Sequence, residues 1–182
     1  MGRIAVSIDN RWGPYEHPAC FASEWGAVGP RLRIGGAHDP GALFRMLVVP
    51  MTGPFVATYV LHTPRTDARP GRYRSPMMTL GELRIFFERF QSFLNGDGRH
   101  DFLIEAPKEP ATVLWDRHDL IFVEGNLDHA LEVLTTLEFQ RGELAVPTPH
   151  RHMIDETRNQ EETDLLMVMD WQWAELLLAD RE

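Results

Sequence analysis

The sequence contains a single cysteine and no long uninterrupted apolar run, and both features exclude classes of protein. With Cys20 as the only thiol, no disulfide can form within the chain, which fits a reducing compartment. The most apolar segment, residues 165–179, is interrupted by Asp170, Gln172 and Glu175, so it is too short and too polar to span a bilayer. The first residues also lack the apolar stretch of a signal peptide. We therefore expect a cytoplasmic protein without membrane insertion.

Several sequence motifs that indicate a particular function are absent as well. The chain has no G-x-G-x-x-G, no G-x-x-x-x-G-K-[ST], no G-x-S-x-G and no H-E-x-x-H. These absences remove the usual sequence signatures of dinucleotide binding, phosphate-loop nucleotide binding, serine hydrolysis and zinc proteolysis.

The composition is that of an ordinary globular protein. The 182 residues are 43% hydrophobic and 25% charged, which predicts one domain over residues 1–182 with a core of its own. The net charge of -9 repels phosphate backbones and so argues against nucleic acid as a partner. Residues 155–182 carry -7 of that charge. This acidic end is either a docking surface for a basic partner or, more simply, a solvated helix face.

The hydrophobic pattern predicts an α+β fold, a mostly antiparallel β-sheet with two or three packed helices. The clearest element is a helix at residues 80–95, because Thr79 and Glu82 form a capping-box pattern and Gly96 is a typical stop. A second helix is expected at 127–138, a short one from Pro18, and one in the tail at 156–169, where Met167 to Trp173 also alternate as a strand would. Strands are expected at 3–8, 31–36, 43–49, 55–63, 101–106, 111–115, 120–125 and 143–147, with 43–49 and 55–63 forming a hairpin and 64–76 a loop.

The segment PTPHRHMID, residues 147–155, is the strongest candidate for chemistry. Its prolines favour an extended backbone, in which His150 and His152 point to the same side and Arg151 points away. Zinc or another divalent transition metal needs three or four such ligands. His118, on the predicted hairpin loop DRHD with Asp116, or the nearby Asp155 could complete the set. The simpler alternative is a polar loop whose histidines bond to the backbone.

An arginine-rich loop is the second candidate. The segment RTDARPGRYR carries four arginines against one aspartate, namely Arg65, Arg69, Arg72 and Arg74. Arginines grip phosphate or carboxylate groups in bidentate fashion, so the loop is a candidate anion site. A charge match with the acidic tail, within the chain or across a dimer, is the simpler interpretation.

These observations leave two functions open. The leading hypothesis is a non-catalytic module that binds a protein or a small ligand, since no catalytic motif stands out. The alternative is a metal-dependent hydrolase with His150 and His152 as ligands, His118 or Asp155 completing the shell, and a metal-activated water. Self-association through the Met- and Trp-rich tail is compatible with both.

Overall fold

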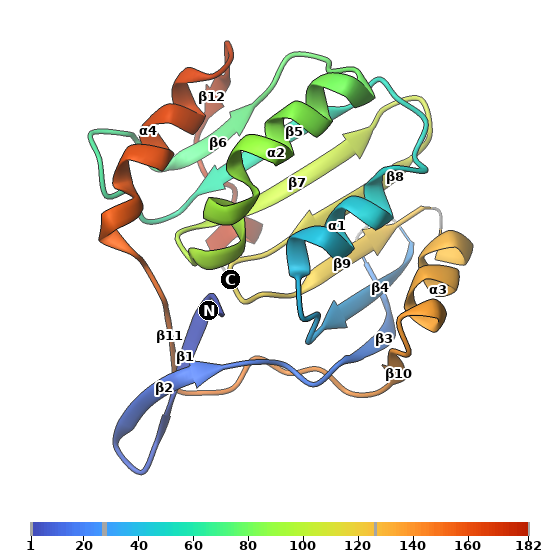
Figure 1. Ribbon diagram of the computed structural model, residues 1–182, viewed down its shortest axis with the longest axis vertical. Helices are drawn as coiled ribbons and strands as arrows, with labels where there is room; N and C mark the ends of the chain where they lie inside the picture. Colours follow the sequence, from blue (N-terminus) through green and yellow to red (C-terminus); the bar gives the residue numbers. More distant parts are fainter. Residues whose placement is uncertain (1, 27–28, 126, 182) are drawn as a thin grey trace.

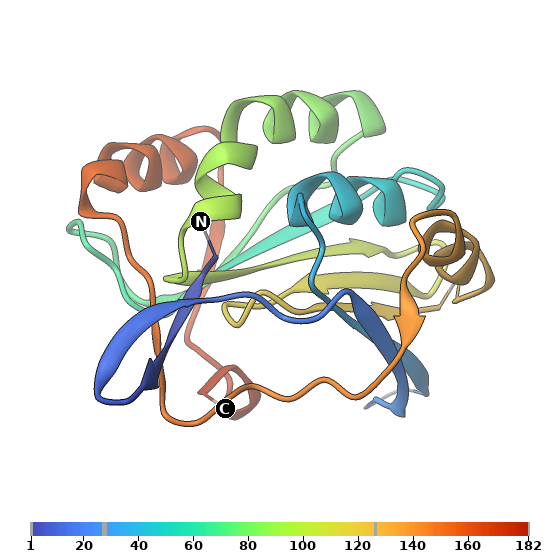
Figure 2. The same ribbon diagram turned by 60° about the horizontal axis from the view of Figure 1, so that its bottom comes forward.

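The protein is an α+β structure in which the α-helices cover one face of a large sheet. The computed structural model describes residues 2–26, 29–125 and 127–181, and the helices lie above the sheet in Figure 2. The helices are α1 (Pro40–Val48), α2 (Leu80–Gly96), α3 (Leu127–Thr136) and α4 (Asn159–Met167), with short 3-10 turns η1 (Glu156–Arg158) and η2 (Leu178–Arg181). The fold class predicted from the hydrophobic pattern is thus confirmed.

The large sheet has nine strands and is antiparallel except at one edge. Its spatial order is β10-β3-β4-β9-β8-β7-β5-β6-β12, and only the β10–β3 pair is parallel. Its strands are β3 (Cys20–Trp25), β4 (Pro30–Gly35), β5 (Val56–Leu61), β6 (Gly71–Arg74), β7 (His100–Ala106), β8 (Ala111–Trp115), β9 (Ile121–Glu124), β10 (Gln140–Arg141) and β12 (Gln172–Ala174). Alternation of buried and half-buried residues along β7, β8 and β9 places one face of these strands against the helices.

A second, three-stranded sheet lies beside the large one in the order β11-β1-β2. It consists of β1 (Ile4–Ile8), β2 (Arg11–Tyr15) and β11 (His150–His152). The β1–β2 hairpin turns through Asp9 and Asn10, which both adopt the positive φ that Asp and Asn tolerate best among residues with side chains. The hairpin projects from the body of the molecule (Figure 1). The small sheet therefore joins the N-terminal segment to residues 150–152, because β11 pairs with β1.

Aromatic side chains fill the space between α2 and the large sheet. Thr79 caps α2 through the predicted capping box with Glu82, and the helix buries a row of phenylalanines. The rings of Phe86 and Phe102 stack at 5.5 Å between centroids, and Phe44 lies 5.9 Å from Trp115. This packing fixes the positions of β7 and β8, and hence of the loop that follows β8.

One predicted hairpin is wrong, because residues 40–48 form helix α1 and not a strand. Asp39 caps this helix by accepting a hydrogen bond from the Ala42 N–H, and Pro40 occupies its first position. The buried side chains are those of Leu43, Phe44, Leu47 and Val48, whose spacing is helical. The apolar run that resembled a strand is one face of a helix packed on α2 and α3.

Three other predictions also need correction. Residues after Pro18 form strand β3 and no helix, because Cys20–Trp25 pairs with β4 along its whole length. Residues 143–147 join neither sheet, since Leu144 instead covers Cys20 and Leu120. The expected loop at 64–76 contains β6, which pairs with β5.

The tail uses both of the structures that its pattern allowed. Residues 159–167 are helical, and residues 172–174 form the edge strand β12 against β6. Within the described residues, no helix combines the length and the apolar character needed to cross a membrane.

Candidate metal centre

The loop between β8 and β9 presents His118 in a conformation that its own sequence stabilises. Asp116 accepts hydrogen bonds at Oδ1 from the N–H groups of His118 and Leu120, at 2.9 and 2.8 Å. Such a bond from an aspartate to the backbone two residues later is a common turn signal. Asp119 then takes a φ of 67°, in the left-handed region that Asp tolerates, and the chain returns into β9. The hairpin turn predicted at DRHD is therefore present, although the connection is residues 116–120 and so one residue longer than expected, with His118 at its tip.

Buried Arg3 fastens this loop to the rest of the molecule. Its guanidinium lies 3.9 Å from the centre of the Trp115 ring and donates to the carbonyl oxygens of Leu94, His100 and Asp116, the last at 2.6 Å. Because Arg3 directly precedes β1, these bonds tie the small sheet to the β8–β9 loop.

Strand β11 supplies the other two imidazoles. Its pairing with β1 sets Val6 opposite His150 and Ile4 opposite His152. Alternation along a strand then places both histidines on one side. Arg151 points the other way, with its guanidinium 4.9 Å from the centre of the Trp12 ring. The geometry predicted for H-x-H in an extended chain is confirmed at these three residues.

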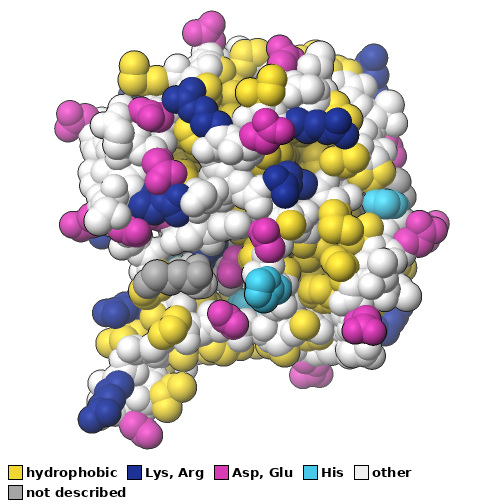
Figure 3. All heavy atoms as spheres, viewed as in Figure 1, with side chains coloured by type: hydrophobic (Ala, Val, Ile, Leu, Met, Phe, Trp, Pro, Cys, Tyr) yellow, Lys and Arg dark blue, Asp and Glu magenta, His cyan; other side chains and the backbone are white. Residues whose placement is uncertain are grey.

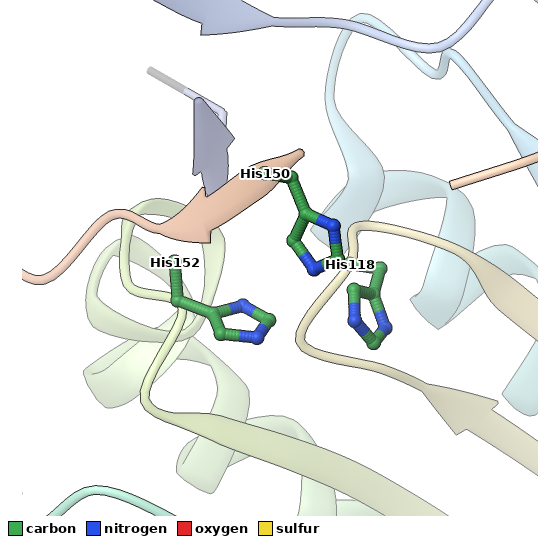
Figure 4. A group of neighbouring side chains, drawn as sticks. All are labelled: His118, His150 and His152. Carbon is green, nitrogen blue, oxygen red and sulfur yellow. The ribbon is translucent and has the colours of Figure 1, made fainter. Parts of the chain in front are cut away.

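The three imidazoles converge. Figure 4 shows the rings of His118, His150 and His152 pointing toward one another from the β8–β9 loop and from β11. Their ring centres lie 5.1 Å apart for His118–His150, 5.0 Å for His118–His152 and 5.5 Å for His150–His152. One nitrogen of each ring lies within 4.8 Å of one nitrogen of each of the others.

Hydrogen bonds at Nδ1 set the tautomer of all three rings. Nδ1 lies 3.1 Å from Asp116 Oδ2 in His118, 2.9 Å from the Pro147 carbonyl oxygen in His150 and 3.2 Å from the Arg117 carbonyl oxygen in His152. These oxygens accept hydrogen bonds, so each Nδ1 carries the proton and each neutral ring keeps its lone pair on Nε2. Metal-binding histidines in proteins are oriented in the same way, by an oxygen acceptor on the nitrogen that does not bind the metal.

The surroundings of His152 also favour a neutral ring. Burial, together with the nearby His118 and Arg117, lowers the pKa of His152 to about 4, although the hydrogen bond to the Arg117 carbonyl acts in the opposite direction. His152 is therefore a neutral imidazole at neutral pH and has a lone pair available for a ligand.

The carboxylates considered beside the histidines have different positions. Asp116 contacts His118 from the outer side, as an orienting group. Asp155 begins η1, where its Oδ1 accepts from the N–H and the hydroxyl of Thr157, at 3.0 and 2.6 Å. Its own N–H donates to Asp97, so Asp155 is not part of the histidine group in the described residues.

The four arginines of the 65–74 loop all have partners inside the chain. Arg72 pairs with Asp180 at 2.5 Å, Arg74 with Glu105 at 2.5 Å and Arg65 with Glu156 at 4.0 Å. Arg69 lies 3.9 Å above the ring of Trp173. The loop thus meets the acidic tail, which is the internal charge match that the sequence allowed, and anion binding there stays a prediction.

Some residues around the cluster gave no sequence signal. Asp101 accepts from the Arg117 N–H at 2.7 Å through one carboxylate oxygen and contacts His62 Nε2 at 2.7 Å through the other. The carbonyl of Arg117 in turn accepts from His152. No motif links these positions, because the contacts are made between strands that lie far apart in the chain.

Comparisons of the chain with protein family models, curated proteins and solved structures found no match.

Proposed function

We propose that the protein binds a divalent transition metal, zinc in the first place, through Nε2 of His118, His150 and His152, and uses it to activate water. The observation that carries this proposal is the common orientation of the three rings, each of which donates at Nδ1 to a fixed oxygen. Three converging rings that can each offer a bare Nε2 form a ligand set, whereas histidines of an ordinary polar loop have no reason to share a tautomer.

The donor type agrees with zinc. Imidazole suits zinc, copper, iron and nickel, and three protein ligands with an open fourth position are typical of catalytic zinc. Ligand nitrogens about 2.0 Å from a tetrahedral ion lie about 3.3 Å from one another, so the present separations of up to 4.8 Å would shorten on binding.

Neutral ligands leave the full charge of the ion to act on bound water. A zinc ion in such a site lowers the pKa of its water to about 7. Held by His118, His150 and His152, the ion would supply a water that has lost a proton to solvent; the oxygen of this water would bond to a carbonyl or phosphoryl centre while the bond from that centre to the leaving group breaks and the leaving group takes a proton from solvent. This reaction class is hydrolysis.

A non-catalytic binding module is the second candidate, and exposed apolar side chains favour it. Met167, Leu177 and Leu178 are 79%, 55% and 83% exposed at the C-terminal end. The charge of the tail favours it less, because five of its acids pair with arginines within the chain, as Glu161 does with Arg158. Figure 3 shows basic and acidic side chains interspersed over α2 and α4. Sedimentation over a range of concentrations tests a second copy of the chain as the partner, and a Leu177→Ser/Leu178→Ser variant should dissociate a dimer; a monomer throughout contradicts self-association.

Metal content distinguishes these functions first. Purified tag-free protein, soaked with zinc and desalted, should hold close to one metal ion per chain by plasma mass spectrometry. The His150→Ala/His152→Ala variant should hold none while it keeps a wild-type far-ultraviolet circular dichroism spectrum. His38, which is exposed and lies outside the cluster, supplies the matched control His38→Ala. Wild-type protein without zinc after soaking contradicts the proposed metal site.

Hydrolysis is tested on the loaded protein. Zinc-loaded wild type should cleave activated esters or phosphate esters, such as p-nitrophenyl acetate or p-nitrophenyl phosphate, faster than zinc-containing buffer without protein. Zinc-loaded His38→Ala is the matched protein control. Stoichiometric zinc without turnover of either class contradicts the hydrolytic part and leaves metal binding standing.

A further inference from the structure

Asp101 and His62 form a nearly buried pair beside the β8–β9 loop. Oδ2 of Asp101 lies 2.7 Å from Nε2 of His62, and their side chains are 13% and 5% exposed. Asp101 stands on β7, and His62 directly follows β5, the strand that pairs with β7. Because a carboxylate oxygen accepts hydrogen bonds, Nε2 of His62 carries a proton and donates it to Asp101.

The second oxygen of Asp101 reaches the loop that carries His118. Oδ1 accepts a hydrogen bond from the Arg117 N–H at 2.7 Å. The carbonyl oxygen of Arg117 in turn accepts from Nδ1 of His152 at 3.2 Å. A continuous series of hydrogen bonds therefore connects His62 and Asp101, on the large sheet, to one of the proposed metal ligands.

The backbone on both sides of Arg117 is held in place. The peptide group that follows Arg117 accepts from His152 at its carbonyl and donates at its N–H to Oδ1 of Asp116, at 2.9 Å. The peptide group that precedes Arg117 donates to Asp101 and accepts from Arg3 at 2.6 Å. The carbonyl that meets His152 is thus a preorganised acceptor, and its position decides where the His152 ring can lie.

The pair with His62 gives the Asp101 carboxylate a fixed orientation. One neutral oxygen would satisfy the Arg117 N–H, and a nearly buried carboxylate costs more to desolvate than such an oxygen does. With its second oxygen bonded to His62, the carboxylate cannot turn away from Arg117 without losing a hydrogen bond. Groups that orient metal ligands in proteins are commonly hydrogen-bonded themselves in this way.

We propose that Asp101 is a positioning residue of the metal site, oriented by His62 and acting through the backbone of Arg117. It holds the Arg117 carbonyl where that oxygen accepts the Nδ1 proton of His152, which leaves Nε2 of the ring free for the metal. This inference rests on the proposed metal function and adds a residue outside the ligand set on which that function depends.

Substitutions of Asp101 in the full-length protein test this role. Asp101→Ala removes the acceptor, so zinc affinity, measured by competition with a chromophoric chelator, should fall by about 10-fold, the low end for loss of an outer partner. Long-range ¹⁵N–¹H NMR of metal-free, histidine-labelled protein should show the His152 proton on Nδ1 in the wild type and a mixture of tautomers in Asp101→Ala. Asp101→Asn should keep the wild-type affinity and tautomer, because its oxygen can accept from Arg117 while its NH₂ donates to His62.

Glu109→Ala is the matched control. Glu109 also accepts a hydrogen bond from a backbone N–H, that of Thr52 at 2.8 Å, but it lies at the opposite end of β8 from the histidine loop. Its zinc affinity and His152 tautomer should equal those of the wild type. If circular dichroism shows that Asp101→Ala does not fold, His62→Phe takes its place, since it removes the group that orients Asp101 and should change both readouts in the same direction.

The outcomes separate this inference from the metal function. Asp101→Ala (or His62→Phe in its place) with wild-type zinc affinity, or with weaker affinity but an unchanged His152 tautomer, overturns the positioning role and leaves the metal site intact. Asp101→Asn that binds zinc as weakly as Asp101→Ala overturns it too, since the charge and not the hydrogen bond would then matter. Wild type that binds no zinc overturns the metal function, and this inference with it.

Discussion

Replacing Asp116 by asparagine tests the tautomer argument on which the metal site depends. In the wild type, Oδ2 of Asp116 lies 3.1 Å from Nδ1 of His118, and Oδ1 accepts from two backbone N–H groups. Asparagine has one acceptor oxygen and one NH₂ donor. If its oxygen stays with the two N–H groups, the NH₂ faces His118 Nδ1.

The count of hydrogen bonds decides which way the amide turns. Turning the oxygen toward His118 would lose two backbone bonds of 2.8 and 2.9 Å to save one of 3.1 Å. At about 1 kcal/mol for each bond, the orientation with NH₂ toward the ring is favoured by about 1 kcal/mol. His118 then moves its proton to Nε2, the atom that has to bind the metal.

The expected result is weaker metal binding in a protein that is still folded. Loss of an orienting partner of a histidine ligand costs about 10- to 100-fold in affinity, or about 1.4 to 2.7 kcal/mol. Competition with a chromophoric zinc chelator measures the affinity, and long-range ¹⁵N–¹H NMR of histidine-labelled protein reads which nitrogen carries the proton. Asp119→Asn is the matched control, because Asp119 stands in the same loop but accepts from the Trp115 indole N–H instead. Its zinc affinity should stay close to that of the wild type.

Two results would refute the reasoning. One is Asp116→Asn with unchanged zinc affinity although His118 has moved its proton to Nε2. The other is a wild-type His118 that already carries its proton on Nε2, since the ring could then not bind through that atom.

Three further predictions concern stability. Zinc at 100 times its Kd should stabilise the wild type by about 2.7 kcal/mol, which raises the Tm by about 5–11 °C; a chelator should reverse the shift, and a variant without His150 and His152 should show none. Arg99→Met should lower the free energy of unfolding in urea by about 3–5 kcal/mol, because it leaves two fully buried carboxylates without their cation. Arg74→Met, in a half-exposed pair, should lower it by less than about 1 kcal/mol. Equal losses for the two variants would contradict this distinction. Burial and neighbouring arginines hold the pKa of His100 well below its usual value. Below about pH 6.5 the unfolded chain therefore binds a proton at His100 that the folded chain does not bind, and the free energy of unfolding decreases as the pH is lowered. His100→Gln should make that fall shallower by up to about 1.4 kcal/mol per pH unit in denaturation curves between pH 7 and 5, and an unchanged slope would show that His100 does not titrate this way.

The sequence alone predicted several features that depend on neighbouring residues. The capping box of Thr79 and Glu82 predicted the start of α2, and the turn-forming residues around Asp116 predicted the β8–β9 loop. The shared side of His150 and His152 followed from strand alternation once the prolines indicated an extended chain. The first two features are stabilised by bonds that span only a few residues.

Where the local pattern of a segment was compatible with both a helix and a strand, packing against the rest of the protein decided its secondary structure. The apolar residues of α1 resembled a strand by their β-branched content, although Asp39 and Pro40 provided a start signal for a helix. Residues 20–25 became a strand because β4 offered them a complete partner. In both cases tertiary contacts selected between alternatives of similar local preference.

The metal site shows the same division within one feature. The sequence determined the types of the ligands and the pairing of two of them on one strand. Only the tertiary structure decided that His118 joins them, that Asp155 does not, and that Asp116, Pro147 and Arg117 orient the rings. The reason is that His118 and β11 meet only because β1 pairs with β11 and Arg3 binds the β8–β9 loop, and contacts between such distant segments leave no periodic trace in the sequence.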